Sequence, residues 1–394
     1  MKGNENMIKL LSKIFIKNYT DYGNPAVRNQ YGVLTGIMGI VLNLLLFAGK
    51  FLAGILTASI AVTADAFNNL SDAGTSIITM VGFKIAGMPA DDEHPFGHGR
   101  VEYVAGLLVS IVIIIMGFEL GKGSVEKIFN PEEITFSALS LGILIASVLV
   151  KLYICLYNRK IGKLINSATM KATAMDSLSD CISTISVIIG LVVFLIWNVN
   201  IDGYVGLLVA VFIFKTGLGA VKESLTPLLG EKADEEYIMD IKKSILSYDN
   251  IVGVHDLIVH NYGVGENVIS LHAEVPATMG FMEAHEMIDM VENDLKKKYA
   301  SCVTIHMDPV EADTEQSLKY KLLVNRAITS VNENITMHDF RMTDGVKCRN
   351  LIFDIEVPFK LKQSDSEIVQ LITAKIKEQD ENLNAVISVD KKVY

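Results

Sequence analysis

Six long apolar segments lie within the first 225 residues of this 394-residue chain. Each approaches the roughly 20 residues that a helix needs to cross a bilayer. The pattern predicts a six-helix transmembrane domain at 31–225, preceded by a polar and basic N-terminal segment at 1–30 that contains a short amphipathic stretch. The predicted spans cover about residues 32–56, 59–87, 101–121, 135–157, 168–196 and 202–222.

Two of these segments carry oxygen-bearing side chains four residues apart. Asn68 and Asp72 lie in the second segment, and Asp176 and Asp180 lie in the fifth. Residues with this spacing share one face of a helix. A carboxylate at the centre of a membrane helix costs roughly 2.5–3.5 kcal/mol. We therefore expect the four side chains to meet around a cation, and ligation by oxygen alone favours a hard ion such as Mn²⁺, Mg²⁺ or Ca²⁺.

The same acidic residues have a purely structural alternative. They would then pair with Lys50, with Lys151 or with one another as buried polar contacts between helices. Asp65 lies seven residues before Asp72, near the same helix face. It is either a supporting group for the cation or a polar residue at the end of the span.

The loop before the third segment is the densest run of possible metal ligands in the sequence. Asp91, His94 and His98 are close enough in the chain to converge on one metal ion. Gly97 and Gly99 give the backbone the freedom that a tight turn requires. A helix N-cap followed by a turn with solvated histidines fits the same residues, and spacing alone does not choose between the two.

Basic residues near the ends of the spans predict the orientation. They gather before the first span and in the loops after the second and the fourth, which places both termini in the cytoplasm. The net charge of −10 argues against a nucleic-acid partner. The four cysteines are scattered, so neither a disulfide framework nor a zinc knuckle is indicated. The basic residues that set the orientation are Lys9, Lys13, Lys17, Arg28, Lys84, Arg100, Arg159, Lys160, Lys163 and Lys171.

The remainder of the chain has short helix and strand signals. Their order is helix, strand, strand, helix, strand, with Gly263 and Gly265 marking a hairpin turn. These elements predict an α+β domain at 226–312, here called the first copy. They are expected at 235–247, 254–262, 267–275, 282–299 and 302–307.

The tail, residues 315–394, repeats the first copy at an offset near 83 residues. His255-Asp256-Leu257 aligns with His338-Asp339-Phe340 at this offset. Ala273-Glu274-Val275-Pro276 aligns with Ile355-Glu356-Val357-Pro358 at an offset one residue shorter. Val303-Thr304-Ile305 aligns with Val386-Ile387-Ser388. We therefore expect a second domain of the same kind at 315–394, here called the second copy.

The two Asp-ending pairs and the loop Ala90-Asp91-Asp92-Glu93-His94-Pro95-Phe96-Gly97-His98-Gly99-Arg100 resemble the cation diffusion facilitator family of divalent-metal/proton antiporters. The resemblance covers about residues 25–312. It implies a homodimer with six spans, a transport site built from spans two and five, and a cytoplasmic domain of the ferredoxin-like kind. It also implies a second metal site in the loop, at Asp91, His94 and His98.

The resemblance further implies a metal site at the cytoplasmic dimer interface. The matching residues are His255, His272, His285, His306 and Asp308, whereas His260 matches no family position. In the second copy Asp354 aligns with His272 and Val389 with His306. Most of the ligand set is then lost, and a structural or regulatory role is expected for this copy.

Zinc members of the family typically have a histidine where this chain has Asp176. The carboxylate therefore resembles the manganese-type branch, and it hardens the site. The expected function is efflux of Mn²⁺ in exchange for protons across the plasma membrane. Fe²⁺ or Zn²⁺/Cd²⁺ export remains an alternative, as does a metal-sensing membrane scaffold or a membrane metalloenzyme. No resident cofactor and no enzymatic activity are expected, because the spans carry no further acid/base cluster and no nucleotide-binding loop.

Overall fold

The computed structural model describes residues 4–56, 60–130, 138–197, 199–263, 265–310, 314–344, 348–359 and 361–391. The chain divides into two compact units. The first comprises residues 1–231 together with the short segment Asn261–Glu266. The second comprises residues 232–260 and 267–394.

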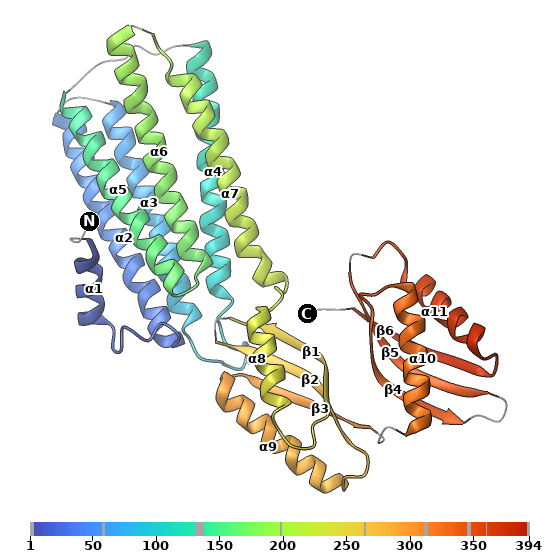
Figure 1. Cartoon of the computed structure of the whole chain (residues 1–394). Coiled ribbons are helices and arrows are strands. Elements are labelled where there is room, and N and C mark those ends of the chain that lie inside the picture. Colours follow the sequence, from blue (N-terminus) through green and yellow to red (C-terminus); the bar gives the residue numbers. More distant parts are fainter. Residues whose placement is uncertain are drawn as a thin grey trace. The chain divides into compact units, whose positions relative to one another are not determined.

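The first unit is a bundle of long helices preceded by one short helix (Figure 1). Among the residues that the structure describes, five helices are long and apolar enough to cross a membrane: α2, α4, α5, α6 and α7. Multiple spans agree with the sequence prediction, but α3, which carries Asn68 and Asp72, is not among the five. The helices are α1 (Asn4–Phe15), α2 (Pro25–Leu56), α3 (Ile60–Ala86), α4 (Val101–Phe129), α5 (Ala138–Leu164), α6 (Ala168–Trp197) and α7 (Asp202–Leu229).

Glycines on one face of α2 allow α3 to approach closely. A Cβ atom at Gly32 would lie 2.0 Å from Cγ of Phe83, and one at Gly36 would lie 2.7 Å from Cβ of Met80. Gly39 continues the same face one turn further along. Small residues at such spacing are typical of membrane helix pairs, where close backbone approach supplies the packing energy. The α2–α3 contact therefore fixes the position of the helix that carries Asp72.

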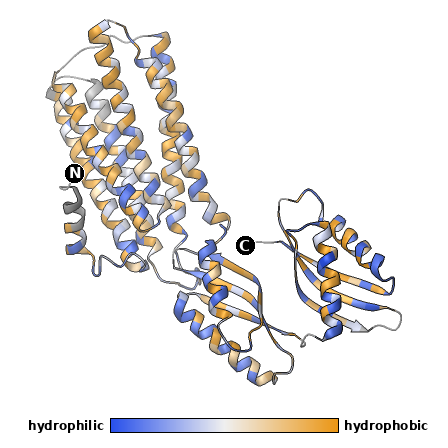
Figure 2. Ribbon diagram, viewed as in Figure 1, coloured by the Kyte–Doolittle hydropathy of each residue, from blue (hydrophilic) through white to orange (hydrophobic). Residues whose placement is uncertain are grey.

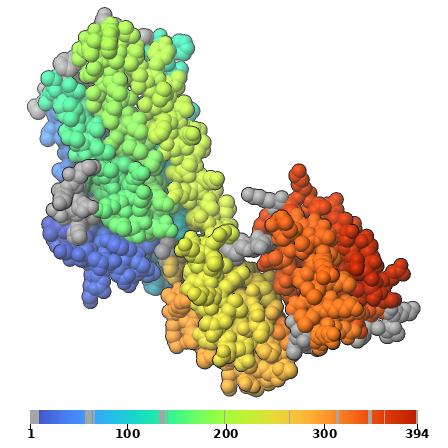
Figure 3. Space-filling model, viewed as in Figure 1, coloured from blue at the N-terminus to red at the C-terminus, as the bar shows by residue number. Residues whose placement is uncertain are grey.

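Glycines also allow close approach of α4 and α7. A Cβ atom at Gly117 would lie 3.1 Å from the backbone nitrogen of Phe214, and one at Gly217 would lie 2.7 Å from Cγ1 of Ile114. Hydrophobic residues predominate along the long helices (Figure 2), and many of their large apolar side chains, such as Leu45, Phe118 and Leu208, are exposed. In the space-filling view, α6 and α7 form one continuous surface (Figure 3). Exposed apolar side chains in a bundle of this kind suit a lipid environment.

A buried ion pair joins the helix ends near the start of α2. Arg28 forms a two-point contact with Glu102 of α4, and its Nε also donates to the carbonyl of Ile165 at 2.7 Å. The Ser167 hydroxyl donates to the same carboxylate at 2.6 Å. Two charges can remain buried here because each has several partners. The contact ties α2 and α4 to the connection between α5 and α6.

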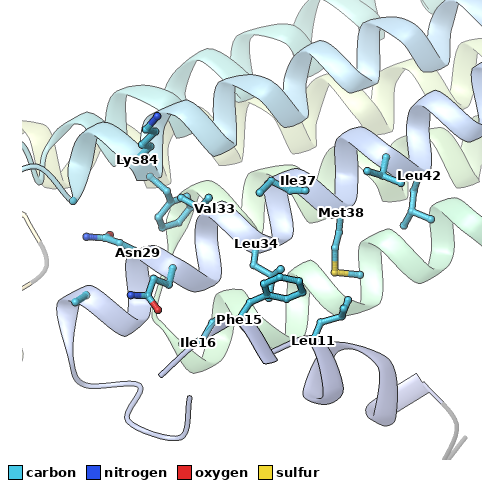
Figure 4. Close-up of a pocket in the computed structure, with 15 residues that line it drawn as sticks. Leu11, Phe15, Ile16, Asn29, Val33, Leu34, Ile37, Met38, Leu42 and Lys84 are labelled. Atoms are coloured by element: carbon cyan, nitrogen blue, oxygen red, sulfur yellow. The ribbon is translucent and has the colours of Figure 1, made fainter. Parts of the chain in front are cut away.

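Helix α1 lies along the bundle as an amphipathic helix. Leu11 and Phe15 of α1 point toward Leu34 and Met38 of α2 (Figure 4). Together with neighbouring side chains they line a largely apolar pocket of about 700 Å³. The sequence prediction of a short amphipathic stretch before the first span agrees with this helix.

The first copy forms a three-stranded sheet with the order β1-β2-β3, and β2 and β3 run parallel. Alternate residues of each strand, such as Leu271 and Val303, pack against Ile241 of α8 and Val291 of α9. The other face of the sheet holds polar side chains. The elements follow the predicted order: α8 (Glu235–Ile245), β1 (Gly253–Asn261), β2 (Asn267–Pro276), α9 (Phe281–Tyr299) and β3 (Cys302–Val310).

The second copy has the same order of elements and the same strand order, β4-β5-β6. Strands β4 and β5 are antiparallel, and β5 and β6 are parallel. Both helices begin with a capping box, formed by Thr314 with Ser317 and by Ser364 with Glu367. The elements are α10 (Glu315–Val331), β4 (Thr336–Asp344), β5 (Arg349–Val357), α11 (Asp365–Gln379) and β6 (Leu383–Lys391).

The segment Asn261–Glu266 contacts the loop before α4, within the first unit. Arg100 donates from Nη2 to the Asn261 carbonyl at 2.7 Å, and its guanidinium lies 4.5 Å from the ring centre of Tyr262. The ring of Phe96 stacks on the same tyrosine at 4.4 Å. Gly263 has a φ of 144°, and a Cβ atom there would lie 2.5 Å from Cα of Gly99. Only glycine fits this approach without a shift of the backbone.

We expect Gly263→Ala to separate this segment from the loop. A side chain at a positive φ costs about 1–3 kcal/mol, and here it also overlaps the backbone. Once Arg100 has lost its partners, limited trypsin digestion of the detergent-solubilised chain should cleave after Arg100 several times faster. Gly280→Ala is the matched control, because its φ is −63° and its nearest contact is at 4.0 Å. Equal cleavage rates in the two variants would contradict the expectation.

Candidate metal centre

Three carboxylates from α3 and α6 meet inside the bundle. One oxygen atom of each of Asp72, Asp176 and Asp180 lies within 4.8 Å of the others. The hydroxyls of Thr79 on α3 and Thr173 on α6 lie 3.0 Å apart and join the same two helices. Each threonine lies about one or two turns from its aspartate, so the contact holds the two acidic faces toward each other.

These carboxylates line a cavity of about 230 Å³, here called the α3/α6 cavity. Asn68 lines the same cavity, although its side chain is exposed. Its role as a fourth ligand remains a prediction. Asp65 belongs to the residues whose side chains lie outside the described part of the chain. The other polar residues that line the cavity are Lys50, Asn69, Glu119, Ser147, Ser179, Ser183 and Thr184.

Lys151 of α5 contacts two of the three acids. Its Nζ lies 2.5 Å from Oδ2 of Asp72 and 2.6 Å from Oδ2 of Asp180. Two of the other carboxylate oxygens, Oδ1 of Asp72 and Oδ1 of Asp176, are buried and have no hydrogen-bond partner within the described ranges. The structural alternative is therefore present, but it leaves two buried acceptors unsatisfied. A cation near these atoms would satisfy them.

The position of Lys151 could be foreseen only in part from the sequence. A lysine within the apolar run at 135–157 is unusual and signals a buried partner. Helical periodicity does not show which neighbouring helix its side chain meets. The structure places it between α3 and α6, where it contacts both acidic pairs.

The loop residues Asp91, His94 and His98 also come together, with one donor atom of each within 4.8 Å. Asp91 lies 3.3 Å from Nδ1 of His94 and 3.4 Å from Nε2 of His98. Nδ1 of His98 lies 3.1 Å from the carbonyl of Pro89, which orients the ring. This geometry allows all three side chains to bind one metal ion.

The same aspartate also caps the turn. Its Oδ1 accepts the backbone N–H of Glu93 at 3.1 Å and that of His94 at 2.7 Å. The hydrogen bond from His94 lowers the pKa of the Asp91 carboxyl below its usual value of 3.8. The carboxylate is therefore ionised at neutral pH and keeps its second oxygen available. Asp91 can therefore cap the turn with Oδ1 and bind a metal ion with Oδ2.

On the open face of the first sheet, His255, His272 and Asp308 converge. Asp308 lies 2.8 Å from Nδ1 of His272 and 3.3 Å from Nε2 of His255. His306 lies beside them, with its Nε2 at 3.3 Å from Asp308. His285 is on α9, where its Nδ1 lies 3.6 Å from Oδ2 of Asp289. Within the described chain the structure thus brings four of the five predicted residues together.

The second copy requires one correction to the alignment. His272 pairs with His306 across β2 and β3, whereas the equivalent Asp354 pairs with Ser388 across β5 and β6. The predicted alignment of Val389 with His306 is therefore wrong by one residue. Because Glu274 pairs with Asp308 and Glu356 pairs with Asp390, the residue that takes the place of Asp308 is Asp390.

Comparison with known proteins agrees with these features. Residues 36–229 match the family model described as cation efflux transmembrane domain, and residues 233–310 match that described as cation efflux protein, cytoplasmic domain. Both matches end before the second copy.

Three relatives show how similar the chain is to known transporters. An uncharacterized transporter of Methanocaldococcus jannaschii is 32% identical over 276 residues, which cover 70% of this chain and 97% of the relative. The manganese efflux system protein MneS of Bacillus subtilis is 28% identical, over 70% of this chain and 94% of its own. A cadmium, cobalt and zinc/H⁺-K⁺ antiporter of the same organism is 24% identical, over 65% and 83%.

The family matches cover the helical bundle with its acidic cavity and the first α-β-β-α-β segment. The relatives are matched over almost their whole length. The chain is therefore a multi-pass membrane protein that belongs to the cation diffusion facilitator family of cation efflux transporters.

Proposed function

We propose that this protein exports Mn²⁺ from the cytoplasm in exchange for protons. The observation that carries the proposal is the cluster of Asp72, Asp176 and Asp180 in the α3/α6 cavity, with two buried oxygens that lack hydrogen bonds. Three carboxylates and no imidazole or thiolate form a hard donor set. A cavity between helices is also where a transporter must hold its ion while access alternates.

The proposal includes the arrangement in the membrane. Helix α3 is taken as the sixth span, because its 27 residues extend about 40 Å at 1.5 Å per residue. Both termini lie in the cytoplasm, on the side where basic residues gather. The first copy is a cytoplasmic ferredoxin-like domain through which two chains form a homodimer, and the second copy adds another domain of this kind. The protein acts in the plasma membrane.

Two observations bear on the choice of metal. Asp176 supplies a carboxylate where a histidine would soften the site, which favours Mn²⁺. A relative named as a manganese efflux protein matches this chain over 276 residues. Fe²⁺ is the second candidate because it accepts the same donors. Zn²⁺ or Cd²⁺ follows, since another relative is named as an antiporter for cadmium, cobalt and zinc.

Lys151 has a defined place in the proposed exchange. Its ammonium group lies 2.5 Å from Asp72 and 2.6 Å from Asp180 and offsets one of their two negative charges. A divalent ion that binds these oxygens must displace it, so the lysine competes with the metal for the same carboxylates. Protons compete for them as well when the cavity opens to the outside. The lysine therefore helps to release the metal without leaving three negative charges together.

Replacing Lys151 with glutamine should therefore tighten Mn²⁺ binding. Removal of the competing ammonium is expected to lower the dissociation constant by about tenfold or more, equivalent to at least about 1.4 kcal/mol. Binding should also depend more steeply on pH, because protons alone then compete. Equilibrium dialysis of the purified chain measures both effects. Lys171→Gln is the control, since Lys171 pairs with Glu223 outside the cavity. Weaker binding in Lys151→Gln would show that the lysine supports the site.

Purified protein in liposomes should take up Mn²⁺ when a pH gradient is imposed. Asp180→Asn should reduce the rate by at least about a hundredfold, because one of the three carboxylates loses its charge. Glu223→Gln, in the exposed pair with Lys171, should transport normally. Flux that does not depend on the gradient would exclude proton antiport. Absence of any flux from a folded chain would favour a sensing scaffold, and turnover of a substrate without flux would favour a metalloenzyme.

Asp176→His should shift the preference from Mn²⁺ toward Zn²⁺. An imidazole nitrogen softens the donor set, and zinc accepts nitrogen ligands readily. We expect the ratio of Zn²⁺ to Mn²⁺ transport rates to rise by about tenfold or more in a side-by-side assay with Fe²⁺ and Cd²⁺. An unchanged ratio would mean that Asp176 does not contact the transported ion.

A further inference from the structure

The open face of the second sheet carries its own cluster of metal-ligating side chains. One donor atom from each of His338, Asp354 and Asp390 lies within 4.8 Å of the others. His338 lies directly opposite Asp354 across β4 and β5, and its Nε2 is 3.6 Å from Oδ2 of Asp390. Three adjacent strands thus contribute one ligand each. The sequence alignment had assigned no metal to this copy.

A β-bulge directs His338 to that face. Phe340 and Met342 of the same strand pack against the core of the second copy, and simple alternation would send His338 the same way. Asp339 has a φ of 48°, and the pairing of β4 with β5 shifts between His338 and Arg341. A bulge of this kind re-aims the neighbouring side chain.

The first copy has the same backbone conformation at the equivalent position. Asp256 also has a φ of 48° and directly follows His255. His255 reaches Asp308 on the open face, whereas Leu257 and Val259 pack in the core. An αL conformation at a residue other than glycine is uncommon. Because this conformation follows both His255 and His338, the backbone of each copy directs its histidine side chain to the open face.

The strand pairings relate the two clusters position by position. His338 takes the place of His255, Asp354 that of His272, and Asp390 that of Asp308. The offset is 83 residues for the first pair and 82 for the other two. The second cluster therefore keeps three donors and replaces one imidazole by a carboxylate, which makes it harder than the first.

His338 has two carboxylates near its Nε2 atom, but neither lies within hydrogen-bonding distance. Its Nε2 is buried and has no hydrogen bond within the described ranges, and the same is true of Nε2 of His255. The two rings lie 4.6 Å apart, and Nε2 of His338 is 3.7 Å from Oδ1 of Asp256. Buried nitrogen atoms that make no hydrogen bond are costly, and a metal ion bound by them removes that cost.

We infer that His338, Asp354 and Asp390 bind one divalent cation of the hard type, such as Mn²⁺ or Fe²⁺. Asp256 of the first copy is the fourth ligand, so the ion connects the two copies. Asp256 and Asp390 both line a cavity of about 490 Å³. The first cluster uses different side chains, so both sites can be filled together. The inference concerns binding alone and does not depend on transport.

The number of Mn²⁺ ions bound per full-length chain tests the inference. Equilibrium dialysis in detergent should show one ion fewer in Asp354→Asn/Asp390→Asn than in the wild type. Asp308→Asn, which alters the first cluster, should remove a different ion, and the triple variant should lose two. Glu381→Gln is the control, because it changes an exposed acid of the second copy outside the cluster. An unchanged number in the double variant would overturn the inference and leave His338 as an imidazole paired with two acids.

A second measurement needs no variant. In wild-type protein loaded with Fe²⁺ and treated with ascorbate in air, side chains that bind the metal are oxidised first. Mass spectrometry should find oxidised His338, and excess Mn²⁺ should protect it. His260 is the internal control, since it is exposed and belongs to neither cluster. Equal oxidation of His338 and His260, or no protection by Mn²⁺, would contradict the inference even if the double variant failed to fold.

Discussion

The structure depends on how three carboxylates are kept inside a bundle of apolar helices. Charges at that depth are stable only when other charges or ligands compensate them. Lys151 supplies one positive charge to Asp72 and Asp180. It leaves two acceptor oxygens in the α3/α6 cavity without a hydrogen bond. The close approach of α2 to α3 at glycines positions the helix that carries Asp72. The contact between Thr79 and Thr173 holds this helix against α6, which carries the other two acids.

Much of this cavity could be predicted from the sequence. Residues four apart share a helix face, and that rule alone selected Asp72, Asp176 and Asp180. The rotation of neighbouring helices does not follow from such a rule. The sequence offers Lys151 as one possible partner of these acids, but only the structure shows that it bridges Asp72 and Asp180, and only the structure shows the buried pair of Arg28 with Glu102. Its position before the first span predicts for Arg28 only a role in setting the orientation.

In the two α-β-β-α-β copies, sequence-based prediction fails at a different point, the register of the last strand. The order of helices and strands follows from periodicity and turn residues, and the structure has that order in both copies. The alignment within the last strand was wrong by one residue, because apolar alternation in β6 reads almost equally well in either register. A shift of one residue exchanges the two faces of a strand. It hid Asp390, which the pairing with Glu356 brings to the open face.

The three clusters with the clearest geometry form a graded series. Within each group of three converging residues, the first copy offers two imidazoles and one carboxylate, the second copy offers one imidazole and two carboxylates, and the α3/α6 cavity offers three carboxylates. Softer ions such as Zn²⁺ prefer the first end of this series, and Mn²⁺ prefers the other. Two different ions at equal concentration would therefore fill the clusters in opposite order. Under the proposed function and the proposed site on the second sheet, one physical property, the hardness of the donor set, would distinguish metals both at the sheets and in the cavity.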